Sequence, residues 1–191
     1  MPKQNSEVIV IAGGNGVGKT TFARAFLQEY NYEFLNADEI AKSLSAENPS
    51  GKKISAGKLF FKRLHEAIAQ NKSLLIESTL SGRYLQKFIE GLQKQDYQIR
   101  IVFLFVESTE ILIERIAERV KKGGHFVSDE DVKRRFVRGK QNFWKTYKNL
   151  ATRWSLVSNS DRNFQEVAFG EKDEYLIADE NLFQIFESEI K

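Results

Sequence analysis

The feature that most constrains this sequence is a glycine-rich octapeptide that directly follows a short apolar run. Residues 13–20 read GGNGVGKT and fit the pattern G-x-x-x-x-G-K-[ST]. The preceding segment, Glu7–Ala12, is apolar and β-branched, which predicts a buried strand. A strand, a glycine loop and a helix in this order surround one anion with backbone N–H groups and the positive end of the helix. We therefore expect the loop to bind the phosphates of a nucleotide.

The residue types in this loop predict separate roles for its members. Lys19 is expected to reach the β- and γ-phosphates, and the hydroxyl group of Thr20 is expected to coordinate Mg²⁺. A dinucleotide-binding G-x-G-x-x-G motif does not fit. If it began at Gly14 its last position would be Lys19, and if it began at Gly16 its last position would be Thr21, where the motif requires glycine. The residues predicted to bind the nucleotide here are Gly14, Asn15, Gly16, Val17, Gly18, Lys19, Thr20 and Thr21.

Composition and charge exclude several other classes of protein. The chain has 191 residues without repeats or linkers, so we expect one domain over residues 1–191. It has no cysteine, and its longest apolar run, residues 101–106, is too short to cross a membrane, so we expect a cytoplasmic protein with no membrane partner. The net charge of +3 suits anionic ligands but is too small to favour nucleic acid as a partner.

Strand and helix patterns alternate along the chain and predict an α/β fold. Apolar runs predict strands at residues 7–12, 33–36, 73–76, 98–106 and 154–158, and helical spacing predicts helices at 20–30, 56–70, 82–94, 108–122 and 129–150. Such an order indicates a mainly parallel sheet of about five strands, covered by helices on both faces in three layers. Ligands of such sheets bind at the carboxyl ends of the strands.

The last of these helices, over residues 129–150, has two different faces. Its predicted core stripe consists of Val132, Phe136, Gly139, Phe143, Tyr147 and Leu150. The opposite face, which we interpret as solvated, carries Arg134, Arg138, Gln141, Lys145 and Lys148.

Two acidic positions follow predicted strands at this edge of the sheet. Asp38 could accept a proton from an attacking hydroxyl group, although Asn36 and Glu39 also fit a helix-capping pair with Asp38 in the first turn. Glu77 could orient a substrate hydroxyl group or a metal-bound water, and Thr79 could bind a polar substrate. The alternative for the second segment is a simple strand exit with a helix cap.

Four arginines flank a glycine-containing loop and predict a helical lid over about residues 119–135. Arg115 and Arg119 precede this loop, and Arg134 and Arg135 follow it. Such arginines could neutralise charge during phosphoryl transfer, or they could pair with neighbouring glutamates along the helix. Asn159 follows the last predicted strand, where a loop could run past the adenine ring of a bound nucleotide. It could equally be a simple turn residue.

Read together, these motifs resemble the zeta toxin family of P-loop kinases, and more narrowly the small zeta-like proteins labelled predicted ABC-type ATPases. The resemblance covers about residues 8–160 and rests on the P-loop, NADE at 36–39, ESTLSG at 77–82 and the segment from Arg115 to His125. It implies a P-loop kinase-like fold, ATP and Mg²⁺ as cofactors, and a small antitoxin as a protein partner. Zeta toxins phosphorylate a hydroxyl group of a UDP-activated amino sugar.

The resemblance also implies site residues. Lys19 and Thr20 would hold phosphate and metal, and Asp38 would be the general base. Substrate contacts are implied for Asp38, Glu77 and Thr79. The arginines that stabilise the transferred phosphoryl group would be Arg119 and Arg135, with Arg115 and Arg134 next, and Arg115 and Asn159 would contact the nucleotide.

Two other functions stay open on the sequence. One is a nucleotide-dependent switch ATPase with no small-molecule acceptor. The other is a polynucleotide kinase that uses the basic helix as a phosphate track. A GTPase is disfavoured, because no Asn-Lys-x-Asp motif is present.

Overall fold

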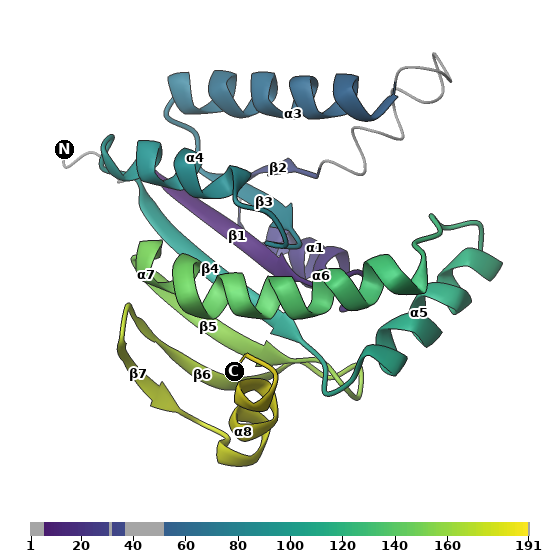
Figure 1. Ribbon diagram of the computed structural model, residues 1–191. Helices are drawn as coiled ribbons and strands as arrows, with labels where there is room; N and C mark the ends of the chain where they lie inside the picture. The colour runs from purple at the N-terminus through teal and green to yellow at the C-terminus, as the bar shows by residue number, and fades with distance from the viewer. Residues whose placement is uncertain (1–5, 31, 37–51, 191) are drawn as a thin grey trace.

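Apolar strands and amphipathic helices alternate along the chain in the predicted order (Figure 1). The structure, a computed structural model, describes residues 6–30, 32–36 and 52–190. Its strands are β1 (Glu7–Gly13), β2 (Glu33–Leu35), β3 (Leu74–Ser78), β4 (Gln98–Phe105), β5 (Arg153–Ser158), β6 (Gln165–Glu171) and β7 (Glu174–Ile177). Its helices are α1 (Lys19–Glu29), α3 (Lys52–Ala69), α4 (Tyr84–Gln93), α5 (Thr109–Lys121), α6 (Asp129–Asn142), α7 (Lys148–Leu150) and α8 (Glu180–Ser188), with a π-helical turn, η1 (Phe143–Tyr147), between α6 and α7.

The strands form one sheet in the order β2-β3-β1-β4-β5-β6-β7. The first five strands in this order run parallel to one another, and β1 lies between β3 and β4. The described sheet has seven strands instead of the predicted five or so, because β6 and β7 add an antiparallel hairpin. β6 reads QEVAFGE and buries only Val167 and Ala168, so it lacks the apolar run that reveals the other strands.

Helices cover both faces of the sheet, which confirms the predicted three layers. One face packs against α1 and α5, and the other packs against α3, α4 and α8. The helical run of α6 and η1 contributes to both layers. Phe136 of α6 packs in the core between the sheet and α1 and α5, and Phe143 of η1 packs in the core on the opposite face. The α-carbon of Phe136 also lies close to Gly14 at the end of β1. Helix α6 therefore crosses the carboxyl edge of the sheet, where ligands are expected.

Residues 129–150 form the predicted long helical run, with one interruption at the π turn. The hydroxyl group of Ser128 caps the start by accepting from the N–H of Asp131. The prediction for Lys148 is wrong: only 4% of this residue is exposed, and its ammonium group pairs with Asp173 in the β6–β7 turn. The extra residue of the π turn rotates Lys148 by about 100° from its place in a continuous α-helix, and the unpredicted hairpin covers it.

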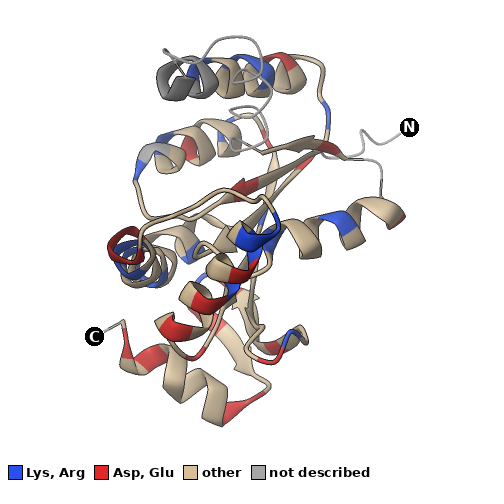
Figure 2. Cartoon of the chain, turned by 90° about the vertical axis from the view of Figure 1, so that its right-hand side faces the viewer, with Lys and Arg blue, Asp and Glu red and all other residues tan. Residues whose placement is uncertain are grey.

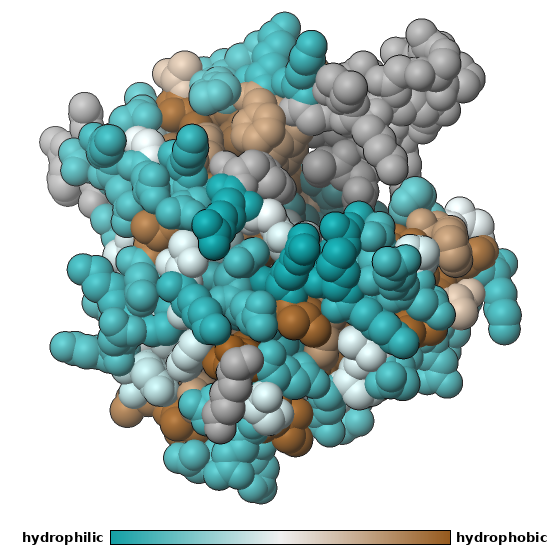
Figure 3. All heavy atoms as spheres, in the orientation of Figure 1, coloured by the Kyte–Doolittle hydropathy of each residue, from teal (hydrophilic) through white to brown (hydrophobic). Residues whose placement is uncertain are grey.

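The surface of the described residues carries both signs of charge. Figure 2 shows Lys and Arg interspersed with Asp and Glu over most helices. On the face in Figure 3, hydrophilic residues dominate the centre and hydrophobic ones form separate patches. No helix within the described ranges is long and apolar enough to cross a membrane.

Candidate nucleotide and acceptor site

The P-loop joins β1 to α1 in a backbone conformation that suits glycine. Gly13 and Gly18 have φ values of +135° and +99°, in a region that residues with a Cβ rarely adopt. A Cβ on Gly18 would also lie 2.6 Å from the Nδ2 atom of Asn159. That nitrogen donates to the carbonyl oxygen of Val17 at 2.7 Å, so Asn159 fixes the loop from the end of β5. Helix α1 begins at Lys19, and its amino end therefore adjoins the loop.

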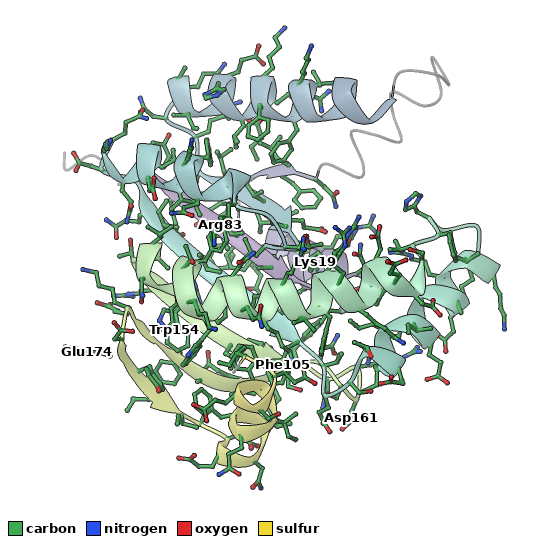
Figure 4. The ribbon with its side chains drawn as sticks, viewed as in Figure 1. Lys19, Arg83, Phe105, Trp154, Asp161 and Glu174 are labelled. Atoms are coloured by element: carbon green, nitrogen blue, oxygen red, sulfur yellow. The ribbon has the colours of Figure 1, made fainter. Side chains whose placement is uncertain are left out.

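Lys19 and Thr20 are the first two residues of α1. Lys19 is labelled near the middle of the view in Figure 4. The Nζ atom of Lys19 donates to the carbonyl oxygens of Gly13 and Gly14, each at 2.9 Å. The hydroxyl group of Thr20 donates to the Oε2 atom of Glu77 at 3.1 Å. Hydroxyl and carboxylate oxygens are the ligand types that Mg²⁺ takes, so these side chains fit the metal predicted at Thr20.

Arg135 reaches this loop from the first half of α6. Its Nη1 atom donates to the Oδ1 atom of Asn15 at 3.1 Å, and its Nη2 atom donates to Asp131 at 3.3 Å. Arg134, which is more exposed, pairs with the same carboxylate at 2.6 Å. Of these two predicted arginines, Arg135 therefore contacts the P-loop, and Arg134 contacts its own helix.

A pocket of about 400 Å³ lies beside the P-loop, within the size range of small-molecule sites. The predicted nucleotide-binding residues that line it are Gly16, Gly18, Thr21, Arg115 and Asn159. Arg119, which was predicted to act in phosphoryl transfer, lines it too. Arg115 donates to the carbonyl oxygens of Asn159 and Ser160, at 2.8 and 2.7 Å, and thereby fixes the segment after β5 that lines the pocket. Burial lowers the pKa of Arg115. Arg119 donates to the carbonyl oxygen of His125 at 2.7 Å.

The β3–α4 loop carries the predicted substrate contact on the other side of the P-loop. The hydroxyl oxygens of Thr79 and Ser81 lie 2.8 Å apart. Leu80 between them is buried, with a φ of +50°, and its N–H donates to the hydroxyl oxygen of Ser78 at 3.1 Å. Arg83, labelled in Figure 4, follows at the start of α4. Hydroxyl groups thus lie directly beyond the carboxylate of β3.

The structure brings most predicted site residues to this edge and adds others. Asp38 lies outside the described residues, as does Glu39, so the base and the capping alternative stay predictions. Arg162 and Phe164 also line the pocket beside the P-loop and were not predicted. They follow β5 at the same carboxyl edge, and that rule of position could have indicated them.

Comparison with solved structures shows the same fold in chains of low sequence identity. The complex AvrRxo1-ORF1:AvrRxo1-ORF2 with sulphate ions has a TM-score of 0.75 and 15% identity, and the match covers 97% of this chain. The same complex with ATP has a TM-score of 0.71 and 16% identity, with the same 97% coverage. In both cases this chain spans 64% of the matched chain, less than two thirds. A structure from the PezAT toxin–antitoxin system of Streptococcus pneumoniae has a TM-score of 0.60 and 17% identity, covering 100% of this chain and 88% of the other. The P-loop kinase-like fold implied by the resemblance is therefore confirmed.

Sequence comparison shows the family. A protein of Haemophilus influenzae, described as uncharacterized, is 32% identical over 131 residues, which cover 69% of this chain and 93% of that protein. The family model described as "AAA domain" matches residues 8–141, which include the P-loop, the β3–α4 loop and all but the last residue of α6. The chain therefore belongs to the AAA domain family.

Proposed function

We propose that this protein is an ATP-dependent phosphotransferase that moves the γ-phosphate to a hydroxyl group of a small molecule. The observation that carries the proposal is the contact between Thr20 and Glu77, at 3.1 Å. It joins the phosphate-binding loop to the strand whose next residues carry the hydroxyl groups of the β3–α4 loop. A protein that only switched between nucleotide states would also use the carboxylate beside Thr20, but it would need no hydroxyl groups beyond that carboxylate.

The residues of the site then divide the work of transfer. Lys19 binds the β- and γ-phosphates, and Thr20, with Glu77 beside it, would hold Mg²⁺. When bound, Mg²⁺ neutralises charge on these phosphates. Arg135 and Arg119 stabilise the charge on the transferred phosphoryl group. Asp38 accepts the proton of the acceptor hydroxyl group. At the same time the oxygen of that hydroxyl group forms the new bond to phosphorus, and the bond between phosphorus and ADP breaks.

The adenine ring is placed in the 400 Å³ pocket beside the P-loop. Phe164 offers an apolar ring as one wall, and Arg115 fixes the carbonyl groups of the Asn159–Ser160 segment, which can accept from an amino group. The neighbour solved with ATP supports this nucleotide.

The acceptor that we propose to test first is a UDP-activated amino sugar, which the resemblance to zeta toxins suggests. The proposed protein partner is a small antitoxin, since the PezAT neighbour is part of a toxin–antitoxin system. The proposed location is the cytoplasm, where ATP is available.

The proposal can be tested with Mg-ATP and two sources of acceptor. The protein is incubated with UDP-N-acetylglucosamine or with a metabolite extract, and products that gain one phosphate are found by mass spectrometry. We expect such a product with the wild-type protein and none with Lys19→Ala. Lys94→Ala, which changes an exposed lysine at the end of α4, should behave as the wild-type protein.

The base is tested separately. Asp38→Asn should bind Mg-ATP with unchanged affinity and lose transfer, and normal turnover would contradict that role. ATP hydrolysis without any phosphorylated acceptor would instead support a switch ATPase. A product only with RNA or DNA ends would support a polynucleotide kinase.

A further inference from the structure

Helix α6 contacts both sides of the proposed reaction. In its first half, Arg135 donates to Asn15 of the P-loop at 3.1 Å. One turn later, Gly139 lies against the β3–α4 loop, where a Cβ would come within 2.7 Å of the carbonyl oxygen of Thr79. The spacing of four residues places Arg135 and Gly139 on the same side of the helix. A single rigid element therefore lies against the nucleotide loop and the acceptor loop.

Two side chains further along the same helical run hold the acceptor loop by its backbone. The Nδ2 atom of Asn142 donates to the carbonyl oxygen of Leu80 at 2.7 Å. The hydroxyl group of Tyr147 donates to the carbonyl oxygen of Gly82 at 2.9 Å. Leu80 has a φ of +50°, which residues with a Cβ adopt only where their surroundings enforce it. The hydrogen bonds from Asn142 and Tyr147 stabilise this backbone conformation on both sides of Ser81.

The π turn allows Asn142 and Tyr147 to face the same loop. Five residues of an α-helix turn through about 500°, which would leave Tyr147 about 140° away from Asn142 around the axis. In a π turn the bonds run from i to i+5, so five residues complete about one turn. The bond from the N–H of Lys148 to the carbonyl oxygen of Phe143 shows this wider turn. Such turns are frequent at functional sites.

We propose that Asn142 and Tyr147 are positioning residues for the phosphoryl acceptor. They hold the β3–α4 loop in the shape that presents Thr79, while Arg135 ties the same helix to the P-loop. Helix α6 thereby sets the separation between the γ-phosphate and the acceptor hydroxyl group. This inference rests on the proposed transfer to a hydroxyl acceptor, and it assigns to both side chains a role without contact to the reacting atoms.

The first measurement is hydrogen–deuterium exchange of the amides in residues 78–82. Tyr147→Phe removes one hydroxyl group, and Asn142→Ala removes the amide. Tyr97→Phe is the matched control, because Tyr97 is also buried and its hydroxyl group donates to a carbonyl oxygen, that of Ile68, away from this loop. We expect exchange about tenfold faster in the first two variants, from the loss of one hydrogen bond, and no change in the control.

The second measurement is transfer kinetics with UDP-N-acetylglucosamine, or with the product-forming fraction of the extract if that probe accepts no phosphate. The KM for the acceptor should rise about tenfold in Asn142→Ala and Tyr147→Phe, with an unchanged Kd for Mg-ATP. Asn142→Gln, which keeps an amide donor, should recover part of the loss.

Two outcomes would overturn the inference, and a third concerns the proposed function. Loop exchange like that of Tyr97→Phe would show that these side chains do not hold the loop. Faster exchange with an unchanged acceptor KM would show that the held shape does not matter for transfer. If the wild-type protein phosphorylated neither UDP-N-acetylglucosamine nor any component of the extract, the proposed function would be refuted, and the inference that rests on it would fail as well.

Discussion

Lys140 is a buried cation that joins α6 to α8, and its replacement gives a sharp test of how the C-terminal helix is attached. Only 1% of the residue is exposed, and its Nζ atom lies 2.6 Å from the Oε2 atom of Glu189. Three aromatic rings surround the ammonium group, at 4.1, 5.2 and 5.5 Å from Nζ to the ring centres: Phe136, Phe105 and Phe186. Burial of the charge costs several kcal/mol, which the carboxylate and the rings offset.

The two partners should respond differently to removal. Glu189→Ala leaves the ammonium group buried without its carboxylate, a change that costs about 3–5 kcal/mol in fully buried pairs. Because the side chain of Glu189 is 32% exposed, solvent screens part of this charge, and we expect the free energy of unfolding to fall by about 2 kcal/mol. Lys140→Met removes the desolvation cost together with the pair and keeps the apolar stem, so we expect a change within about 1 kcal/mol.

Urea unfolding of the two single variants and the double variant measures this coupling. The double variant should be as stable as Lys140→Met alone. Lys62→Met serves as a surface control, since Lys62 pairs with Glu66 at 3.8 Å on an exposed helix face and should matter by less than about 0.5 kcal/mol. If Lys140→Met lost as much stability as Glu189→Ala, the ion pair itself would be a net source of stability and the reasoning would be refuted.

The pH dependence gives an independent check of the same site. Burial lowers the pKa of Lys140 in the folded protein below its ordinary value of 10.5. Between the folded pKa and 10.5 the unfolded chain binds more protons, so the free energy of unfolding rises with pH in that interval. Lys140→Met lacks this component. The stability of the unchanged chain relative to Lys140→Met should therefore increase as the pH approaches 10.5, and a decrease would contradict the assignment.

Three further outcomes follow from single contacts. Gly139→Ala should lower the free energy of unfolding by about 2 kcal/mol in thermal melts, because its Cβ would meet the Thr79 carbonyl oxygen at 2.7 Å, although alanine favours helices by about 1 kcal/mol. A neutral result would show that the helix can shift. Asn159→Ala should raise the Kd for Mg-ATP about tenfold in calorimetric titration, since the bond to Val17 that fixes the P-loop is lost; unchanged affinity would argue against this role. Desolvation and a hydrogen bond to Glu7 raise the pKa of Tyr32 to about 12, so its stabilising contribution should be fully present below about pH 10 and be lost as the pH rises from about 10 to about 12, which ultraviolet titration can follow. An ordinary pKa would contradict this.

The fold was largely predictable, because the P-loop and the apolar strands are local patterns. Residues 13–20 combine glycines, a lysine and a threonine with a preceding strand, and the structure places them between β1 and α1 as expected. The parallel strands are apolar on both faces and therefore stand out as continuous runs. The β6–β7 hairpin was missed because β6 buries only two of its residues and β7 buries none, so neither strand carries a continuous apolar run.

The candidate site was predictable in its residue types and only partly in its contacts. A position at the carboxyl end of a strand already indicated Glu77, Thr79 and Asn159. Which groups meet was not predictable, because the partners are far apart in the chain: Asn15 and Arg135 are separated by 120 positions. The helical spacing predicted Tyr147 only as a core residue.

The sequence by itself determined where a phosphate can bind, since a backbone that bends at glycine and a helix that starts at Lys19 are properties of one short segment. Tertiary structure alone decided what lies opposite that phosphate. It carries α6 across the edge of the sheet, and the π turn after it directs Tyr147 to the β3–α4 loop. The physical reason is that the register of this helical run depends on its packing against both layers of the protein. The spacing of apolar residues along the sequence does not predict where a turn contains an extra residue.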